Sequence, residues 1–195
     1  MEQSRSISKR ICVVASSDEL SQTFMGSLIY KTGLEMQVLE ELEKAKRTQY
    51  SDIVPYMREK HIDTTFYTPK NYCAFVDESD AADTVVYLLD ATNAKDDTSK
   101  VFQTTAAKKS LQRDGRALVL IDRMQAVNWD ESTYKDLVSE LSQTIKDVHG
   151  ANIAALAIPI SSTDGDNMIE TSKKSTWYSS GDSGPLTVVH AIDGD

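Results

Sequence analysis

The segment Arg10–Gly33, RICVVASSDELSQTFMGSLIYKTG, joins an apolar run to a helix-like stretch through a short polar loop. In α/β proteins with a parallel sheet, the first such turn commonly holds the phosphates of a nucleotide at the N-terminus of the helix. That task normally uses glycine N–H groups, which the phosphates approach closely, and often a lysine. Neither residue type occurs between Ala15 and Gln22. The segment therefore predicts a strand, a turn and a helix without the residues that usually bind phosphate.

The same alternation continues along the chain. Apolar runs that can be buried on both faces occur at Ile11–Ala15, Val85–Leu89, Ala117–Ile121 and Ala154–Pro159. Continuous runs rich in Val, Ile and Leu are typical of parallel strands covered by helices on both sides. Helical patterns separate these runs. We therefore predict an α/β fold, a three-layer sandwich with a mostly parallel sheet.

Several helix boundaries follow from the sequence. One helix is expected to begin after Asp130, which can cap it, and to end at Gly150. A second helix is predicted over Ser99–Arg113. The charged segment Leu34–Lys60 has leucines at helical spacing and predicts one or two helices. Pro185 is placed to open a last short helix.

One segment departs from the parallel pattern. Asp63–Asp77, DTTFYTPKNYCAFVD, has the pattern of two strands joined by a tight Pro-Lys-Asn turn. It predicts an antiparallel hairpin that adds one antiparallel edge strand to the sheet. The sequence has no convincing second-domain boundary, so residues 1–195 are expected to form a single domain, with residues 1–9 flexible.

The composition limits the classes of function. The 195 residues carry a formal net charge of −9, whereas nucleic-acid affinity depends on clustered Lys and Arg; nucleic-acid partners are therefore disfavoured. No apolar run approaches the roughly 20 residues that cross a bilayer, so no membrane partner is expected. Cys12 and Cys73 lie in strand-like apolar runs, which favours buried, reduced thiols. These features favour a cytoplasmic location, with the nucleus also open.

Three motifs, taken in order, connect the sequence to a known family. SLIYKTG (Ser27–Gly33), TPKNYCAFVD (Thr68–Asp77) and PISSTDGDNMIE (Pro159–Glu170) resemble HLIYKCG, TPKYYVTVID and PISGWNGDNMLE of the GTPase domain of elongation factor 1-alpha, a translational GTPase. The resemblance implies a P-loop GTPase-like fold. Because the chain ends where that domain ends, it also implies a form that lacks the family's two β-barrel domains.

The resemblance places the family's phosphate loop, GHVDSGKST, on Ala15–Thr23, where the residues that contact nucleotide differ. The final glycine of the loop is replaced by Leu20, whose Cβ obstructs the close approach of a phosphate. The lysine that reaches the β- and γ-phosphates is replaced by Ser21, and the magnesium-binding serine by Gln22. Glu19 adds a negative charge, which repels a polyanion.

The second phosphate contact differs in the same way. The family's DAPGH falls on DESDA, where Asp77 is kept, the glycine that meets the γ-phosphate becomes Asp80, and the histidine that positions the attacking water becomes Ala81. A helix that follows in the family has no counterpart, since the strand Val85–Leu89 comes almost at once. The resemblance therefore implies that the nucleotide-sensing switch is deleted.

Guanine recognition is altered as well. The family's NKMD falls on DRMQ, so that Asp122 replaces an asparagine and Gln125 replaces the aspartate that accepts two hydrogen bonds from guanine. Gln125 offers one carbonyl oxygen, beside an amide that opposes a donor. Arg123 replaces a lysine that braces the base, and Ser161 remains as in the family. We therefore expect no cofactor, no metal ion and no catalytic residue.

The favoured interpretation is a catalytically inactive pseudo-GTPase that acts as a protein–protein interaction or scaffold module. Its contacts are predicted at the amphipathic segment Leu34–Arg47 and at the acidic loop Asp77–Asp83, which lacks the ligand spacing of a calcium site. A homodimer, an exchange-factor-like protein and a fixed place in a larger complex are all compatible with the sequence. The alternative is a divergent translation-elongation-factor-like GTPase with residual nucleotide binding. An RNA-binding factor is disfavoured by the acidic charge.

Overall fold

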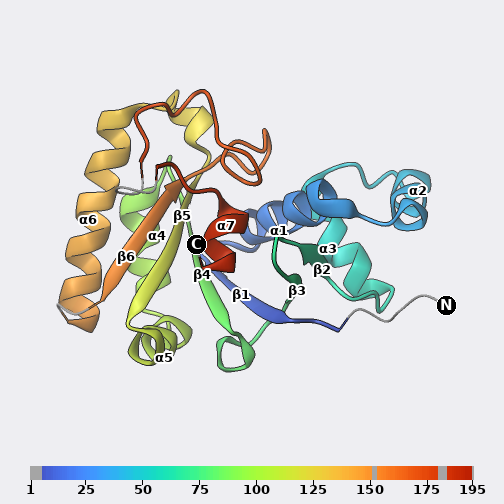
Figure 1. Ribbon diagram of the computed structural model, residues 1–195, viewed down its shortest axis with the longest axis horizontal. Coiled ribbons are helices and arrows are strands. Elements are labelled where there is room, and N and C mark those ends of the chain that lie inside the picture. Colours follow the sequence, from blue (N-terminus) through green and yellow to red (C-terminus); the bar gives the residue numbers. More distant parts are fainter. Residues whose placement is uncertain (1–5, 151–152, 180–183, 195) are drawn as a thin grey trace.

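A computed structural model describes residues 6–150, 153–179 and 184–194 of the chain. In this part, a six-stranded sheet lies between two layers of helices (Figure 1). The strand order is β2-β3-β1-β4-β5-β6, with β2 antiparallel to β3 and every other neighbouring pair parallel. The strands are β1 (Lys9–Ala15), β2 (Thr65–Tyr67), β3 (Tyr72–Phe75), β4 (Thr84–Asp90), β5 (Arg116–Asp122) and β6 (Ala154–Pro159). The predicted α/β sandwich with one antiparallel edge strand is confirmed.

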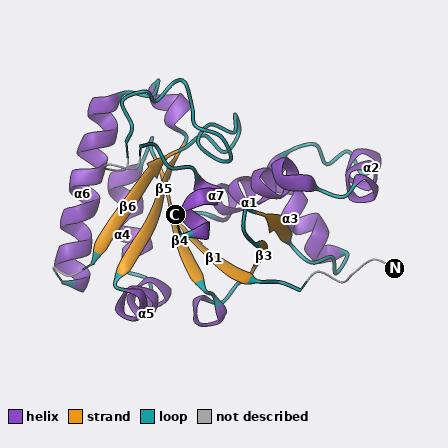
Figure 2. Ribbon diagram, viewed as in Figure 1, coloured by secondary structure: helices purple, strands orange, loops and turns teal. Residues whose placement is uncertain are grey.

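Helices cover both faces of the sheet (Figure 2). Buried side chains of α1, α2, α3 and α7 form one apolar cluster with the sheet, and those of α4, α5 and α6 form a second one. The helices are α1 (Asp18–Gly33), α2 (Met36–Lys44), α3 (Tyr50–Glu59), α4 (Ala94–Phe102), α5 (Thr105–Asp114), α6 (Glu131–His149) and α7 (Val188–Asp193), with 3-10 turns η1 (Ser79–Ala81) and η2 (Met124–Val127). Among the described helices, none has the length and apolar character needed to span a membrane.

The central strands bury both of their faces, as the continuous apolar runs predict. In β4, Val86 and Leu88 pack in the first cluster, whereas Tyr87 and Leu89 pack in the second. Successive side chains of a strand point to opposite faces, so a strand between two helical layers has to be apolar at every position. This requirement explains why the four apolar runs were recognisable without any alternation.

The predicted hairpin is confirmed by the antiparallel pairing of β2 with β3. Ser8, directly before β1, is held against β3, because its N–H donates a hydrogen bond to the carbonyl of Tyr72 at 2.8 Å. The N-terminal segment predicted to be flexible, residues 1–9, falls in large part on residues 1–5, which lie outside the described residues.

The single helix predicted over Ser99–Arg113 is wrong. The chain forms α4 and α5 instead, which separate at Gln103 and Thr104. The hydroxyl of Thr104 accepts a hydrogen bond from the N–H of Ala107 at 3.1 Å. Thr104 therefore caps a new helix, and this local bond competes with continuation of α4.

Asp130 and Gly150 bound α6 as predicted. The predicted start of the last helix is wrong, because Pro185 does not open α7. That helix starts directly after Thr187, whose hydroxyl lies 2.7 Å from Nδ1 of His190, one turn further on. Thr187 is the N-cap residue of α7, but its hydroxyl contacts the His190 side chain and caps no N–H of the helix.

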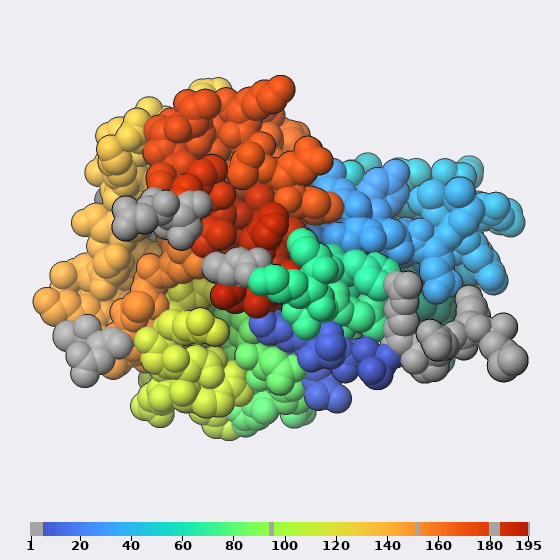
Figure 3. Space-filling view, viewed as in Figure 1, coloured from blue at the N-terminus to red at the C-terminus, as the bar shows by residue number. Residues whose placement is uncertain are grey.

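The charged segment Leu34–Lys60 forms two helices, α2 and α3, in agreement with its leucine spacing. The hydroxyl of Tyr56 on α3 donates a hydrogen bond to Glu41 on α2 at 2.6 Å. In the space-filling view, α2 forms the end of the molecule opposite α6 (Figure 3).

Candidate functional site

The turn between β1 and α1 consists of two residues, Ser16 and Ser17. The Ser17 hydroxyl accepts a hydrogen bond from the N–H of Leu20 at 3.3 Å, and the Ser17 carbonyl accepts one from the N–H of Ser21 at 3.2 Å. Because α1 already starts at Asp18, the N–H groups of Leu20 and Ser21 are used within the helix. No loop remains at this turn that could surround a phosphate.

The residues at the predicted phosphate-loop positions are ordinary residues of α1. Leu20 is 2% exposed and belongs to the first apolar cluster. The hydroxyl of Ser21 donates to the carbonyl of Asp18 at 2.9 Å, and Gln22 is partly exposed. One of the three side chains therefore packs in the core, and the other two lie nearer the helix surface.

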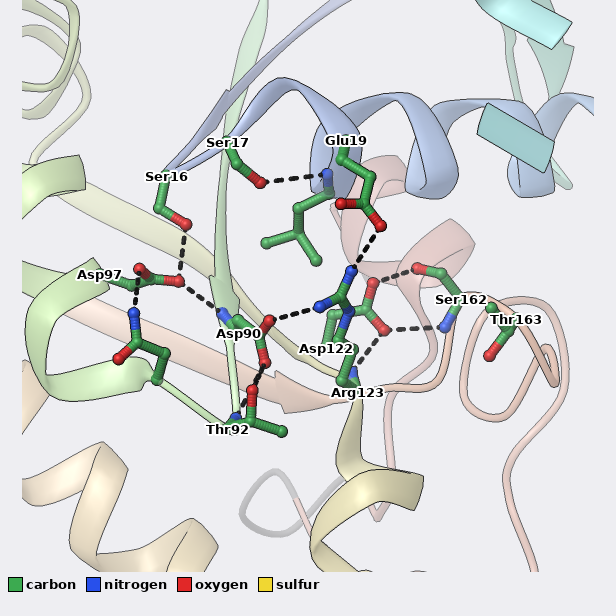
Figure 4. Close-up of polar contacts among 12 residues, drawn as sticks. Ser16, Ser17, Glu19, Asp90, Thr92, Asp97, Asp122, Arg123, Ser162 and Thr163 are labelled. Atoms are coloured by element: carbon green, nitrogen blue, oxygen red, sulfur yellow. Dashed lines mark hydrogen bonds and ion pairs between the residues drawn. The ribbon is translucent and has the colours of Figure 1, made fainter. Parts of the chain in front are cut away.

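An arginine side chain occupies the carboxyl edge of the sheet beside this turn. Arg123 follows β5 with a backbone φ of 62°, and its guanidinium donates to Asp90 at 2.9 Å and to Glu19 at 3.1 Å. Figure 4 shows the Arg123 side chain directed between these two carboxylates. The Asp90 side chain is 13% exposed and the Glu19 side chain 75%. The pair with Asp90 is therefore the better shielded from solvent and contributes more to stability.

Asp97 connects this network to the β1–α1 turn. The Ser16 hydroxyl donates to Asp97 at 2.6 Å, and the same carboxylate accepts a hydrogen bond from the N–H of Asp90 at 3.3 Å. The carboxylates of the network are those of Glu19, Asp90, Asp97 and Asp122. Two like charges 4 Å apart repel by about 1 kcal/mol in bulk water and by more near a protein. This negative charge therefore opposes the binding of a polyanion.

Asp122 is buried beneath the network and is 2% exposed. Its Oδ1 accepts hydrogen bonds from the N–H groups of Arg123 at 2.6 Å and Ser162 at 2.8 Å, and its Oδ2 accepts one from the Ser162 hydroxyl at 2.5 Å. Burial raises the pKa of Asp122 above the ordinary carboxyl value, although these hydrogen bonds and the charge of Arg123 act in the opposite direction.

We expect Asp122→Asn to raise the melting temperature at neutral pH by a few degrees. The pKa of Asp122 is higher in the folded than in the unfolded state, so ionisation costs stability as the pH rises. That cost is absent below the unfolded-state pKa of about 4. Asparagine keeps an acceptor for the two N–H groups and can donate to Ser162. Thermal melts of both proteins from about pH 4 to pH 8 test this expectation. A gain that persists unchanged at the acidic end would contradict it.

A cavity of about 180 Å³ lies beside Arg123 and is closed in part by the first residues of α3. The side chain of Gln125 lines it, and its Nε2 donates to the hydroxyl of Thr163 at 3.2 Å. Pockets that enclose drug-sized ligands commonly measure about 300–1,000 Å³. The cavity is therefore smaller than a whole nucleotide requires.

Three of the predicted site residues, Leu20, Asp122 and Gln125, come together at this cavity. Ser161 is fully buried nearby, where its hydroxyl accepts a hydrogen bond from the N–H of Asp164 at 3.1 Å. This hydrogen bond therefore stabilises the loop after β6.

Asp77, Asp80 and Ala81 lie away from the cavity, in the loop that leads to the amino end of β4 (Figure 1). Asp77 forms an ion pair with Arg58 on α3, and Asp80 forms one with Lys109 on α5 at 2.8 Å. Because no crossover helix follows β3, the chain turns directly toward the edge of the sheet where β4 begins. These residues cannot reach a ligand at the carboxyl edge. In the described parts of the chain, no group of three or more His, Cys, Asp or Glu side chains is arranged to hold a metal ion.

Sequence reasoning missed the ion pair between Arg123 and Asp90. Asp90 ends β4, Arg123 follows β5, and Asp90 lies opposite Asp122 in the parallel register. Since parallel strands end at the same edge, the two charges could have been placed together from the strand pattern. The contact of Asp97 with Ser16 gave no such signal, because it depends on how α4 packs.

No protein-family model matches the chain. Curated relatives nevertheless include elongation factor 1-alpha from Blastobotrys adeninivorans, 28% identical over 200 residues, which cover 86% of this chain and 44% of the relative. Elongation factor 1-alpha from Coccidioides immitis is 26% identical over 222 residues, which cover 94% of this chain and 48% of the relative. The resemblance predicted from the three motifs is confirmed. The chain spans less than half the length of these relatives.

Solved structures confirm the fold of a translational GTPase domain. Sup35 complexed with GDP superposes with a TM-score of 0.65 at 19% identity, covering 99% of this chain and 47% of that chain. The GTPase-like domain of S. cerevisiae Ski7, bound to GTP, superposes with a TM-score of 0.59 at 13% identity, covering 96% of this chain and 50% of that chain. At these identities the likeness concerns the fold alone.

Proposed function

We propose that this chain is a pseudo-GTPase domain that has lost guanine-nucleotide binding and catalysis and serves as a protein-interaction or scaffold module. The observation that carries the proposal is the two-residue turn between β1 and α1, in which the N–H groups of Leu20 and Ser21 are bonded within the helix. The ion pair of Arg123 with Asp90 supports it, since internal charges replace those that a nucleotide would bring.

The proposal concerns this domain alone, because the chain spans less than half the length of its curated relatives. A cytoplasmic location is part of the proposal. It is consistent with relatives named as a translation factor and with two free cysteines, Cys12 and Cys73, that are both buried.

A divergent GTP-binding domain is the alternative. One observation favours it, since the GTPase-like domain of Ski7 has the same fold and is bound to GTP. The cavity of about 180 Å³ and the carboxylates around Arg123 argue against it in this chain.

The proposed partner contacts are the segment Leu34–Arg47 and the loop Asp77–Asp83. α3 lies between them, because its Tyr56 bonds to Glu41 of the first and its Arg58 pairs with Asp77 of the second. Side chains of both segments remain exposed. Within this proposal they offer a surface that does not depend on nucleotide.

Titration with labelled GTP and GDP tests the loss of nucleotide binding. We expect no complex with a Kd below roughly 100 μM, a value that corresponds to about −5.5 kcal/mol. Thermal melts with magnesium and GTP should coincide with melts without them. By comparison, a ligand present at 100 times its Kd would add about 2.7 kcal/mol to the free energy of unfolding.

The variant Ser21→Lys serves as the matched control, because it restores the family's lysine but leaves the turn closed. We expect it to bind nucleotide no better than the wild type. Rescue by this one substitution, or a thermal shift produced by GTP and not by ATP, would favour the alternative.

A further inference from the structure

A groove of about 600 Å³ lies at the amino edge of the sheet, where α7 ends. Its floor consists of apolar residues at the starts of β5 and β6, including Leu118 and Leu156, together with Ala191 and Ile192 of α7. α7 is six residues long. In the view of Figure 1, no helix lies in front of the lower ends of β5 and β6. Leu118 and Ile192 are buried, so the apolar surface that solvent reaches in the groove is the start of β6, where Ala154 and Ala155 are exposed and Leu156 is partly exposed.

The charged side chains at the rim of this groove differ in how many hydrogen bonds they already form within the chain. Both carboxylate oxygens of Asp114 bond to Arg113, at 2.6 and 3.0 Å, and Asp83 accepts a hydrogen bond from the N–H of Arg10 at 2.7 Å. Lys9 donates to the carbonyl of Ile192 and keeps two further N–H donors.

Arg116 is exposed at the start of β5, and its guanidinium has no hydrogen-bond or ion-pair partner among the described residues. The rim of the groove therefore carries the carboxylates of Asp83 and Asp114 beside the cations of Lys9 and Arg116, and Arg116 is the cation that has no partner among the described residues. A partner suited to it carries an apolar side chain with carboxylates beside it.

The outer face of α2 has that composition. Met36 is 70% exposed, and Glu40 and Glu43 follow it at four and seven residues, on the same side of the helix. The opposite side of α2 is already used, because Val38 and Leu42 are buried in the first apolar cluster. The pair of Glu40 with Lys44, at 3.9 Å and with both side chains largely exposed, holds Glu40 only weakly.

We infer that the groove of one copy binds the outer face of α2 of a second copy. Met36 inserts over the apolar floor, and Glu40 and Glu43 meet Arg116 and Lys9. Within one chain α2 lies at the end of the molecule, away from β5 and β6, so the contact has to form between copies (Figure 3). The inference rests on the proposed function in that it uses the segment Leu34–Arg47 as a contact. It goes further by identifying the partner.

The expected association is weak and can continue beyond a dimer. A helix of nine residues is about 13 Å long, so the contact is small and its Kd is expected in the micromolar range. The two contacting surfaces differ, which makes the interface head-to-tail. Such interfaces form rings or open chains rather than closed two-fold dimers.

Sedimentation velocity of the full chain, from about 5 to 500 μM, tests this inference. We expect the weight-average sedimentation coefficient to rise with concentration and to rise less at high salt. Arg116→Glu should raise the concentration needed for association at least about tenfold, and Met36→Asp should do the same. An equimolar mixture of Arg116→Glu with the double variant Glu40→Lys, Glu43→Lys should associate again. In both contacts that the two variants can form with each other, the groove and α2 carry opposite charges.

Lys108→Glu is the matched control, since it changes the net charge equally on an exposed residue of α5 that does not line the groove. Coinciding thermal melts of all variants show that each one folds. A chain that stays monomeric over the whole range, association unaffected by Arg116→Glu, or an equal loss from Lys108→Glu would each overturn the inference. None of these results bears on nucleotide binding, which is measured separately.

Discussion

Leu20→Gly is expected to lower the free energy of unfolding by about 3–6 kcal/mol. Replacement of a buried leucine by alanine costs about 2–5 kcal/mol, and glycine in a helix costs about 1 kcal/mol more than alanine. Leu20 is 2% exposed and packs in the first apolar cluster from the first turns of α1. In a chain of this length such a loss lowers the melting temperature by roughly 6–24 °C.

The substitution is informative because it restores the glycine that the resemblance assigns to this position. If the turn were still a working phosphate loop, Leu20→Gly would leave stability nearly unchanged and would improve nucleotide binding. Ser21→Ala on the adjacent, partly exposed position is the control, and we expect it to change stability by less than about 0.5 kcal/mol. Differential scanning calorimetry of the three proteins makes the comparison. A Leu20→Gly variant that melts within two degrees of the wild type would contradict our placement of Leu20 in the core.

Gly26→Ala is expected to destabilise the chain by about 2–3 kcal/mol, the cost of overpacking a tight contact. A Cβ at Gly26 would lie 1.9 Å from the carbonyl oxygen of Tyr50 and 3.3 Å from the Cβ of Ile53. Both neighbours belong to α3, so the clash cannot be relieved by the rotation of a side chain. α3 has to move away from α1, and this movement disturbs the packing of Ile53 in the first apolar cluster.

The sign of this effect separates packing from helix propensity. In an exposed helix interior, alanine in place of glycine stabilises by about 1 kcal/mol, so propensity alone predicts the opposite result. Urea unfolding of Gly26→Ala beside Ser21→Ala compares the two positions on α1. A Gly26→Ala variant as stable as the wild type would mean that α1 and α3 lie further apart than the structure shows.

Much of the sheet could be predicted from the sequence, because a strand that is buried on both faces is apolar at consecutive positions. The four apolar runs correspond to β1, β4, β5 and β6, and Asp63–Asp77 contains the antiparallel hairpin. Helix ends were predicted where a capping residue coincided with a change of periodicity, as at Asp130. They were missed at Thr104, where the cap lies inside a stretch that is helical on both sides.

The candidate site was less accessible to sequence reasoning. The resemblance proposes which positions align with the family's nucleotide contacts, but it does not report what surrounds those positions in this chain. Asp90 and Arg123 are 33 residues apart in the chain, and Ser16 and Asp97 are 81 apart. The first pair follows from the order of the parallel strands, which end at the same edge of the sheet, whereas no pattern reports the second pair, because it depends on how α4 packs. The acidic loop illustrates the same limit, since its partners Arg58 and Lys109 come from two separate helices.

By itself, the sequence determined the alternation of strands and helices, the hairpin, and the lack of glycine and lysine in the first turn. These features depend on side-chain type and spacing within a few residues, where periodicity and turn chemistry act. The tertiary structure alone decided that Leu20 is a core residue, that Ser16 bonds to Asp97, and that Asp77 lies away from the cavity beside Arg123. Each of these outcomes is set by contacts between segments distant in the chain, and such contacts form only when the helical layers pack on the sheet.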